Sequence, residues 1–183
     1  MGRRGRAILA GESFFFVTTT VVRWTNVFSD ERCCDILLHN IRHYQVRYKF
    51  AVLGYVIMPS HFHWIVEVDP TFGTISDIMR DIKKFSAWDI MEELQMQGHS
   101  ALLGLFRNEA EGYSDKKRKF WRERFDDEVI RNQQMFLAKL TYIHNNPVKA
   151  GLVERAEDYK YSSARNYILG DHSVLFVDTE RAG

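Results

Sequence analysis

The hydrophobic pattern of the chain predicts three strands in its first third. Runs rich in β-branched and aromatic residues occupy positions 13–22, 49–58 and 61–68. The second and third runs are separated only by Pro59 and Ser60, which predicts a tight hairpin and therefore antiparallel pairing of these two strands. A further short strand is expected within 119–130.

Three amphipathic helices are predicted between and after these strands. Apolar side chains recur at helical spacing over 29–47, 74–97 and 132–146. Pro147 is expected to end the third helix, because the residue before a proline is disfavoured in the α conformation. Positions 98–118 show no firm period, so we expect a loop or a partly disordered insertion there. The tail from about position 150 is expected to be irregular.

In chain order, the predicted elements run strand, helix, strand, strand, helix, strand. This order is typical of the split βαβ unit, so the predicted fold class is α+β, a ferredoxin-like sandwich with a central antiparallel sheet. The chain has 183 residues, of which 45% are hydrophobic, and this is enough for one compact domain over 1–183.

Composition and charge change this picture little. The 25 Lys and Arg residues balance 24 Asp and Glu, so the net charge of +1 neither favours nor excludes a nucleic-acid partner. Only local runs are basic, at the start of the chain and over 115–124. The adjacent Cys33 and Cys34 build no disulfide framework, and no apolar run reaches the roughly 18 residues of a membrane span. We therefore expect a soluble cytoplasmic protein with no membrane partner.

The candidate chemistry begins with His61 and His63 at the start of the third predicted strand. Residues i and i+2 of a strand point to the same face, so the two imidazoles lie side by side while Phe62 points the other way. Neutral imidazoles in that arrangement can both bind one divalent cation and leave positions for water or substrate. Two partly exposed histidines at a strand end are the ordinary alternative, so this motif alone names no reaction.

The second candidate is Tyr142, which lies one helical turn before Asn146. A tyrosine hydroxyl is a poor nucleophile, but it can attack a phosphodiester that a metal ion polarises, and the product is then a covalent phosphotyrosine. The alternative is a core tyrosine with its hydroxyl at the edge. Asn145 and Asn146 before Pro147 would then be an ordinary helix-terminating turn.

Several motifs together resemble one family. The segments GYVIMPSHFHWIVEV, IMRDIKKF, FW at 120–121, YIHNNPVKAGLV and YSSARNY occur in this order. Together they resemble the REP-associated tyrosine transposases, from the insertion-sequence, single-tyrosine branch of the HUH (His-hydrophobe-His) nucleases. The resemblance runs from about position 13 to position 168. It implies the ferredoxin-like fold and metal-dependent cleavage and joining of single-stranded DNA near hairpins, through a 5′-phosphotyrosine.

The resemblance also implies roles for individual residues. His61 and His63 would be metal ligands, Tyr142 would be the nucleophile, and Asn146 would stand in the place of a third ligand. A site of mixed nitrogen and oxygen ligands accepts either Mg²⁺ or Mn²⁺.

The expected partner is single-stranded or hairpin DNA. Basic residues would pair with phosphates and aromatic rings would stack on unpaired bases. The candidate DNA-binding residues are Arg122, Arg124, Trp121 and Lys117. Phe120 and Trp64 are further candidates for stacking. Burial is the alternative for all three aromatic residues, and it is favoured for Trp64 because this residue lies in a strand.

Two other functions and two assembly states are compatible with the sequence. A domesticated relative would bind DNA hairpins without cutting them, although the intact His61, His63 and Tyr142 argue against it. A metal-dependent phosphodiesterase using an activated water would release free ends and never form a covalent adduct. A monomer and a homodimer fit the sequence equally well.

Overall fold

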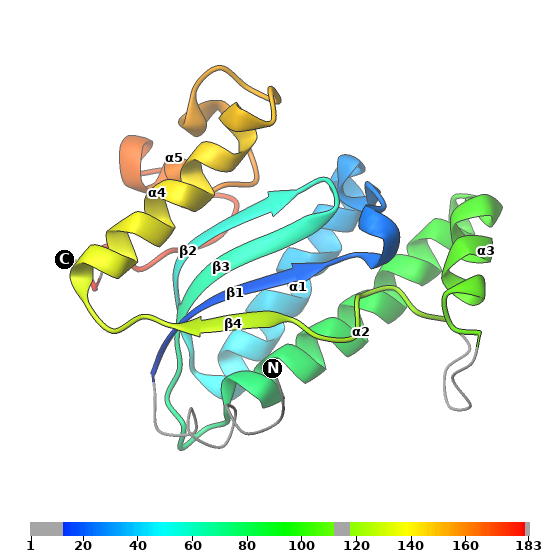
Figure 1. Ribbon diagram of the computed structural model, residues 1–183, viewed down its shortest axis with the longest axis horizontal. Helices are drawn as coiled ribbons and strands as arrows, with labels where there is room; N and C mark the ends of the chain where they lie inside the picture. The colour runs from blue at the N-terminus through cyan, green and yellow to red at the C-terminus, as the bar shows by residue number, and fades with distance from the viewer. Residues whose placement is uncertain (1–12, 112–117, 182–183) are drawn as a thin grey trace.

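The structure is a computed structural model that describes residues 13–111 and 118–181. Its centre is a four-stranded antiparallel sheet in the order β2-β3-β1-β4 (Figure 1). The strands are β1 (Phe14–Thr20), β2 (Ala51–Met58), β3 (His61–Glu67) and β4 (Asp126–Val129). The predicted hairpin between β2 and β3 is confirmed, with Pro59 and Ser60 as its turn.

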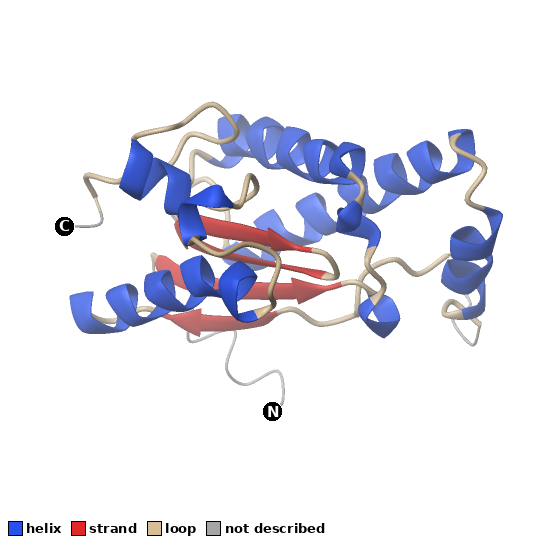
Figure 2. Ribbon diagram, turned by 90° about the horizontal axis from the view of Figure 1, so that it is seen from above, coloured by secondary structure: helices blue, strands red, loops and turns tan. Residues whose placement is uncertain are grey.

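Helices cover both faces of the sheet. The helices are α1 (Glu31–Tyr48), α2 (Ile75–Met96), α3 (Ser100–Asn108), α4 (Gln133–Lys149) and α5 (Ala164–Leu169). Figures 1 and 2 show α1 and α2 on one face and α4 on the other, while α5 lies beside the edge strand β2. The predicted ferredoxin-like α+β fold is therefore confirmed, with α3 as an additional helix between α2 and β4.

Side-chain caps determine where the long helices begin. Asp30 is the N-cap of α1, and its carboxylate accepts a hydrogen bond from a backbone amide of the first turn. Thr74 begins α2 and forms a capping box with Asp77. Asn132 caps α4 by accepting a hydrogen bond from the backbone amide of Met135 at 2.8 Å.

The close packing of α4 on the sheet depends on a glycine. A Cβ atom at Gly54 of β2 would lie 2.8 Å from Cδ1 of Leu140 and 3.1 Å from Cδ1 of Ile143. Both residues belong to the inner face of α4, so the helix packs directly on the backbone of β2. Gly54 thus sets the height of α4 above the sheet.

The prediction that Pro147 ends the helix is wrong, because α4 continues through this residue to Lys149. A proline in a helix removes one backbone hydrogen bond to the residue four positions earlier. Here the proline lies close to the end of α4, so few later helical bonds depend on this turn. Pro147 is also buried, and its carbonyl accepts a hydrogen bond from the amide of Leu152 at 2.9 Å.

The regions predicted to be irregular contain short helices. Within 98–118, α3 buries Leu103 and Phe106, and the ring of Phe106 lies 5.1 Å from that of Phe120. In the tail, α5 follows a segment that pairs with the edge of β2, where the amide of Ile57 donates to the carbonyl of Tyr161 at 2.9 Å. Packing partners distant in sequence stabilise both regions, and periodicity alone does not reveal such partners.

Cys33 and Cys34 are both buried free thiols, as expected from their adjacent positions. Among the described residues, no helix combines the length and the apolar character needed to cross a membrane.

Candidate active site

His61 and His63 lie side by side where β3 begins. In the sheet register they stand opposite Thr20 and Thr18 of β1. Their ring centroids are 4.8 Å apart, with the ring planes nearly perpendicular at 84°. The expectation that both imidazoles share one face of the strand is confirmed, and this face is the one that α4 covers.

Hydroxyl groups hold both imidazoles in place. Oγ1 of Thr18 lies 2.7 Å from Nδ1 of His63, and Oγ of Ser60 lies 3.1 Å from Nδ1 of His61. These contacts engage the Nδ1 atoms, so the Nε2 atoms are the ring nitrogens available for a ligand. Nε2 of His63 is buried and has no hydrogen-bond partner among the described residues. Such contacts to the second ring nitrogen are typical of histidines that bind metals, because they fix the orientation of the ring.

The surroundings keep the two histidines neutral. Burial, together with the nearby His61 and Lys139, lowers the pKa of His63 to about 3. Burial also lowers the pKa of His61. An imidazole must be deprotonated to bind a metal ion. Both rings are therefore in the ligand-competent form at neutral pH.

Tyr142 lies next to this histidine pair. Its ring centroid is 5.4 Å from that of His63, at an interplanar angle of 78°. The ring also contacts Phe16 edge-on, at 6.1 Å, and Phe16 stacks on His63 at 5.6 Å. Tyr142 is nevertheless 43% exposed. It is therefore not the core residue of the alternative interpretation, but a partly open side chain beside the imidazoles.

Asn146 is one turn further along α4. Figure 1 shows α4 running in the same direction as β2, so its last turns approach the rim where β3 begins. Nδ2 of Asn146 is buried and has no hydrogen-bond acceptor among the described residues. Rotation of the side-chain amide of Asn146 by 180° would place Oδ1 where Nδ2 now lies. Mg²⁺ and Mn²⁺ bind oxygen ligands of this kind.

The residues at the rim fit a divalent cation of this kind. Nε2 of His63 and Nδ2 of Asn146 are two of the four buried side-chain polar atoms that have no hydrogen-bond partner among the described residues. Unpaired buried polar groups are rare, and a missing ion is one of their ordinary explanations. Within 13–111 and 118–181, no group of three or more His, Cys, Asp or Glu side chains offers an alternative site.

A charged pair borders the site on the β4 side. Nζ of Lys139, one turn before Tyr142 on α4, lies 2.5 Å from a carboxylate oxygen of Glu128. The same ammonium group lies 4.7 Å from the centre of the Phe16 ring. Phe16 is thus surrounded by Lys139, Tyr142 and His63, and it links them in one contiguous cluster.

The expectation that Trp121 stacks on DNA bases is corrected. Trp121 is only 6% exposed, stacks on Phe28 at 5.6 Å and donates from Nε1 to Oγ of Ser86 at 3.3 Å. Phe120 and Trp64 are buried as well. The burial alternative therefore holds for all three aromatic residues.

Arg122 lies on the same side of the sheet as the histidines. Its backbone amide donates to the carbonyl of Thr20 at 2.8 Å, next to a bridge between Val21 and Trp121. Directly opposed residues in antiparallel strands share a face, so Arg122 shares the face of Thr20 and His61. Trp121 must then point to the opposite face, which explains its burial.

Of the other two candidate DNA contacts, Arg124 is exposed on the same edge segment. Lys117 lies outside the described residues, as does the basic run at the start of the chain.

Trp24 is a residue at this rim that the sequence analysis missed. Its ring centroid is 5.4 Å from that of His61, edge-on, and the side chain is 56% exposed. The one available signal was its position, between the end of a strand and the start of a helix. Without the register of the sheet, that position has no visible relation to His61.

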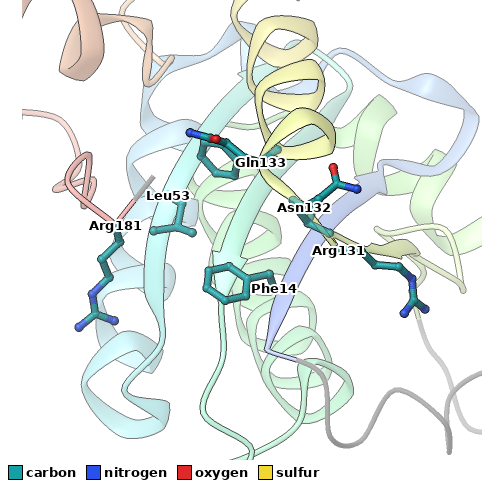
Figure 3. Close-up of a pocket in the computed structure, with 8 residues that line it drawn as sticks. Phe14, Leu53, Arg131, Asn132, Gln133 and Arg181 are labelled. Atoms are coloured by element: carbon teal, nitrogen blue, oxygen red, sulfur yellow. The ribbon is translucent and has the colours of Figure 1, made fainter. Parts of the chain in front are cut away.

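A separate hollow of about 330 Å³ lies near the beginning of β1 and of α4, away from the histidine pair. Figure 3 shows Phe14 and Leu53 in this hollow, with Arg131 and Arg181 at its two sides. Arg181 forms ion pairs with Glu67 and Asp178. None of the residues that line the hollow is His61, His63 or Tyr142, so the hollow is separate from the candidate active site.

Comparison with known proteins shows which family this chain is similar to. The family model described as "Transposase IS200 like" matches residues 14–146. A REP-associated tyrosine transposase of Escherichia coli is 23% identical over 163 residues, covering 89% of this chain and 82% of that protein. A Haemophilus influenzae protein, named as a candidate REP-associated tyrosine transposase, is 25% identical over 116 residues. That match covers 63% of this chain and 60% of the relative, so it leaves two fifths of the relative's length unmatched.

The fold is also similar to a solved structure. That structure is a REP-associated tyrosine transposase bound to a REP hairpin, and the two chains superpose with a TM-score of 0.64. They are 22% identical, and the match covers 92% of this chain and 87% of the other. The likeness shows that both proteins have the same fold.

Proposed function

Because this chain belongs to the family of IS200-like transposases, we propose that it cleaves and rejoins single-stranded DNA through a phosphotyrosine on Tyr142. The observation that carries the proposal is the position of Tyr142, partly exposed and 5.4 Å from His63 between ring centroids. A nucleophile beside a pair of neutral imidazoles is the arrangement that metal-assisted phosphodiester chemistry needs.

Tyr142 performs the chemical step. Its hydroxyl oxygen attacks the phosphorus of the scissile phosphodiester, and the bond from phosphorus to the 3′ oxygen breaks. The tyrosine proton passes to solvent, which the 43% exposure of Tyr142 makes accessible, and the leaving 3′ oxygen takes up a proton from water. The 5′ end stays attached to Tyr142. When the 3′-hydroxyl of a second strand attacks this ester, the DNA is rejoined and the tyrosine is restored.

His61, His63 and Asn146 would hold Mg²⁺ or Mn²⁺. The Nε2 atoms of both histidines and Oδ1 of Asn146 would be the ligands, because Thr18 and Ser60 already engage the Nδ1 atoms. When bound, the cation supplies positive charge that polarises the phosphate and offsets the charge that grows on its oxygens. Phe16 keeps the ring of His63 fixed and covers its inner side.

Arg122 and Arg124 would bind DNA phosphates. Arg122 shares a face with His61, and both arginines are exposed on the edge segment before β4. We propose a DNA hairpin with an adjacent single strand as the substrate. The structurally similar transposase bound to a REP hairpin supports this choice, as does the E. coli relative named for REP sequences.

The deciding experiment uses single-stranded DNA that carries the hairpin flanking the gene of this protein. With Mg²⁺ or Mn²⁺ present, we expect a protein–DNA adduct that survives denaturation, and none with Tyr142→Phe. Binding without an adduct would instead support a non-catalytic hairpin-binding protein. Free ends without an adduct would support a phosphodiesterase that uses water.

A further inference from the structure

The loop that follows β1 places an exposed tryptophan at the edge of the candidate metal site. The loop is a single 3₁₀ turn over Val22–Trp24, and the indole of Trp24 lies edge-on to His61 with 5.4 Å between ring centroids. The rings of Trp24, His61, His63 and Tyr142 follow one another along the rim, at successive centroid distances of 5.4, 4.8 and 5.4 Å. Trp24 therefore borders the histidine pair through His61, and Tyr142 borders it through His63.

The backbone at this point is strained. Arg23 has φ 53° and Trp24 has φ 54°, so two consecutive residues that are not glycine adopt the left-handed conformation. Side chains other than glycine rarely adopt this conformation, and never without an energetic cost. Strain of this kind gathers at functional sites, where surrounding contacts maintain it.

Contacts on both sides hold the turn in this conformation. The amide of Val22 donates to the carbonyl of Phe120 at 2.9 Å, and the amide of Trp24 donates to the carbonyl of Val21 at 3.1 Å. The guanidinium of Arg23 forms an ion pair with Glu109, just beyond α3. The segment before β4 and the end of α3 thus both fix the turn that presents Trp24.

Stability does not explain the exposure of Trp24. Of the four tryptophans of the chain, Trp64 and Trp121 are buried in the core. Trp88 is as exposed as Trp24, at 55% against 56%, but it lies on α2 with the ammonium group of Lys84 4.9 Å from its ring centroid. Trp24 instead leaves more than half of its side chain open to solvent directly beside a candidate metal ligand.

We propose that Trp24 is a base-stacking residue that binds the nucleobase next to the scissile phosphate. This inference rests on the proposed function and adds a subsite to it. A phosphate held between the histidine pair and Tyr142 has its neighbouring nucleotide within reach of the indole. Aromatic rings bind unpaired bases by stacking, which tolerates any base. The subsite therefore selects an unpaired nucleotide and not a particular sequence.

The location of Arg122 agrees with this path for the strand. Arg122 shares the face of Thr20 and His61, on the segment that also anchors the turn of Trp24. A strand whose base stacks on Trp24 would bring its next phosphates toward this exposed guanidinium. Base and backbone would then be bound by two residues that are far apart in the sequence.

The test measures DNA affinity in a Tyr142→Phe background, so that no covalent product forms. The probes are the hairpin flanking the gene with a single-stranded extension on the 5′ side, on the 3′ side, or on neither. The variants are Trp24→Ala, Trp24→Phe and the control Phe176→Ala, which changes another exposed aromatic side chain. We expect Trp24→Ala to weaken binding of one extended hairpin about tenfold or more and to leave the blunt hairpin unaffected. Trp24→Phe should restore most of the affinity, and Phe176→Ala should resemble the parent protein.

Two further measurements separate stacking from a structural role. Affinity for Mn²⁺ without DNA should be the same in Trp24→Ala and its parent. The extended hairpin should quench tryptophan fluorescence in the Trp88→Phe protein but much less in the Trp24→Phe protein. The fluorescence arm decides the question even if Trp24→Ala fails to fold.

The outcomes also separate this inference from the proposed function. If the protein with Tyr142 intact forms the covalent adduct, but Trp24→Ala in the Tyr142→Phe background binds extended hairpins as tightly as Phe176→Ala, the stacking subsite is wrong and the function stands. An equal loss on blunt and extended hairpins, or a loss of Mn²⁺ affinity, would also overturn it. If the parent protein binds none of the hairpins, both proposals fail together.

Discussion

The two faces of the central sheet differ sharply, and β3 contributes to both. On the face covered by α1 and α2, Phe62, Trp64 and Val66 are completely buried in a large apolar core. On the face covered by α4, the alternate positions carry His61 and His63, beside a much smaller apolar cluster. Because alternate residues of a strand point to opposite faces, β3 contributes core side chains to one face and the candidate metal ligands to the other.

Both faces bury polar atoms without partners among the described residues, but the side chains differ. The apolar face holds Oγ1 of Thr19 and Nε1 of Trp64, whereas the α4 face holds Nε2 of His63 and Nδ2 of Asn146, which belong to side chains that can bind a metal ion. Unpaired buried groups of this kind destabilise a fold. The apolar face offsets this cost, because it supplies most of the buried hydrophobic surface.

The largest expected effect comes from the side chain proposed as nucleophile. Tyr142→Phe should abolish the covalent DNA adduct, because no other atom of the side chain can attack phosphorus. It should leave stability almost unchanged, since the ring is retained and is partly exposed. A denaturing gel after incubation with hairpin DNA and Mn²⁺ checks the first expectation, and thermal unfolding checks the second. An adduct at wild-type level would exclude Tyr142 as the nucleophile.

The next prediction compares neighbours on opposite faces of β3. Phe62→Ala should lower the free energy of unfolding by about 3–5 kcal/mol, because it opens a cavity in the apolar core. His63→Gln should cost less stability and remove Mn²⁺ binding. Urea denaturation and a Mn²⁺ titration of both variants measure the two effects. If His63→Gln lowers the free energy of unfolding more than Phe62→Ala does, the inferred difference between the stabilising face and the chemical face is wrong.

A third change tests the hydroxyl that holds His63. Thr18→Val removes the contact at 2.7 Å to Nδ1 while keeping the shape of the side chain. Loss of such a supporting contact weakens metal binding by about 10–100-fold. Mn²⁺ affinity should fall by this amount while the far-ultraviolet circular dichroism spectrum stays the same. Thr71→Val, an exposed change at a distant loop, is the control and should bind Mn²⁺ normally.

Acid should weaken the fold through its buried histidines. Burial lowers the pKa of His144 to about 4, while its Nε2 lies 2.8 Å from Oγ of Ser163. The unfolded chain binds the proton near pH 6.5, so between pH 6.5 and 4 it carries more protons than the folded protein. The free energy of unfolding should therefore fall as pH decreases through this window. His63, with its pKa lowered to about 3, extends the loss to lower pH.

The test for this acid sensitivity is urea denaturation between pH 7 and pH 4. His144→Asn should have a flatter profile than the wild type, by at most a few kcal/mol. The control is His99→Asn, which changes an exposed histidine and should leave the profile unaltered. Identical profiles for wild type and His144→Asn would mean that His144 is not kept neutral by the fold.

The smallest expected effect is a shift of α4 over the sheet. Gly54→Ala introduces a Cβ atom 2.8 Å from Cδ1 of Leu140, so α4 must move by a few tenths of an ångström or the leucine must turn. Adduct formation should slow several-fold, because Tyr142 moves relative to His63, while stability falls by only about 1 kcal/mol. An unchanged rate of adduct formation would show that the side chain of Leu140 rotates to make room and that α4 does not move.

Much of the fold follows from local signals in the sequence. The strand over 61–68, the hairpin at Pro59 and Ser60, and the long helix α2 all have strong periodicity or turn chemistry. The misplaced features have weak local signals. The short helix α3 depends on the contact of Phe106 with Phe120, and Pro147 is accommodated because it lies near the end of a buried helix.

By itself, the sequence determined that His61 and His63 share one face, since the period of a strand is a local property of the backbone. It also determined which motifs occur and in which order. Only the tertiary structure decided that Tyr142 lies against His63, that Trp121 is buried while Arg122 is exposed, and that Trp24 borders the site. These facts depend on sheet register and on the height of α4. Both arise from contacts between residues far apart in the chain, which no local pattern of side chains encodes.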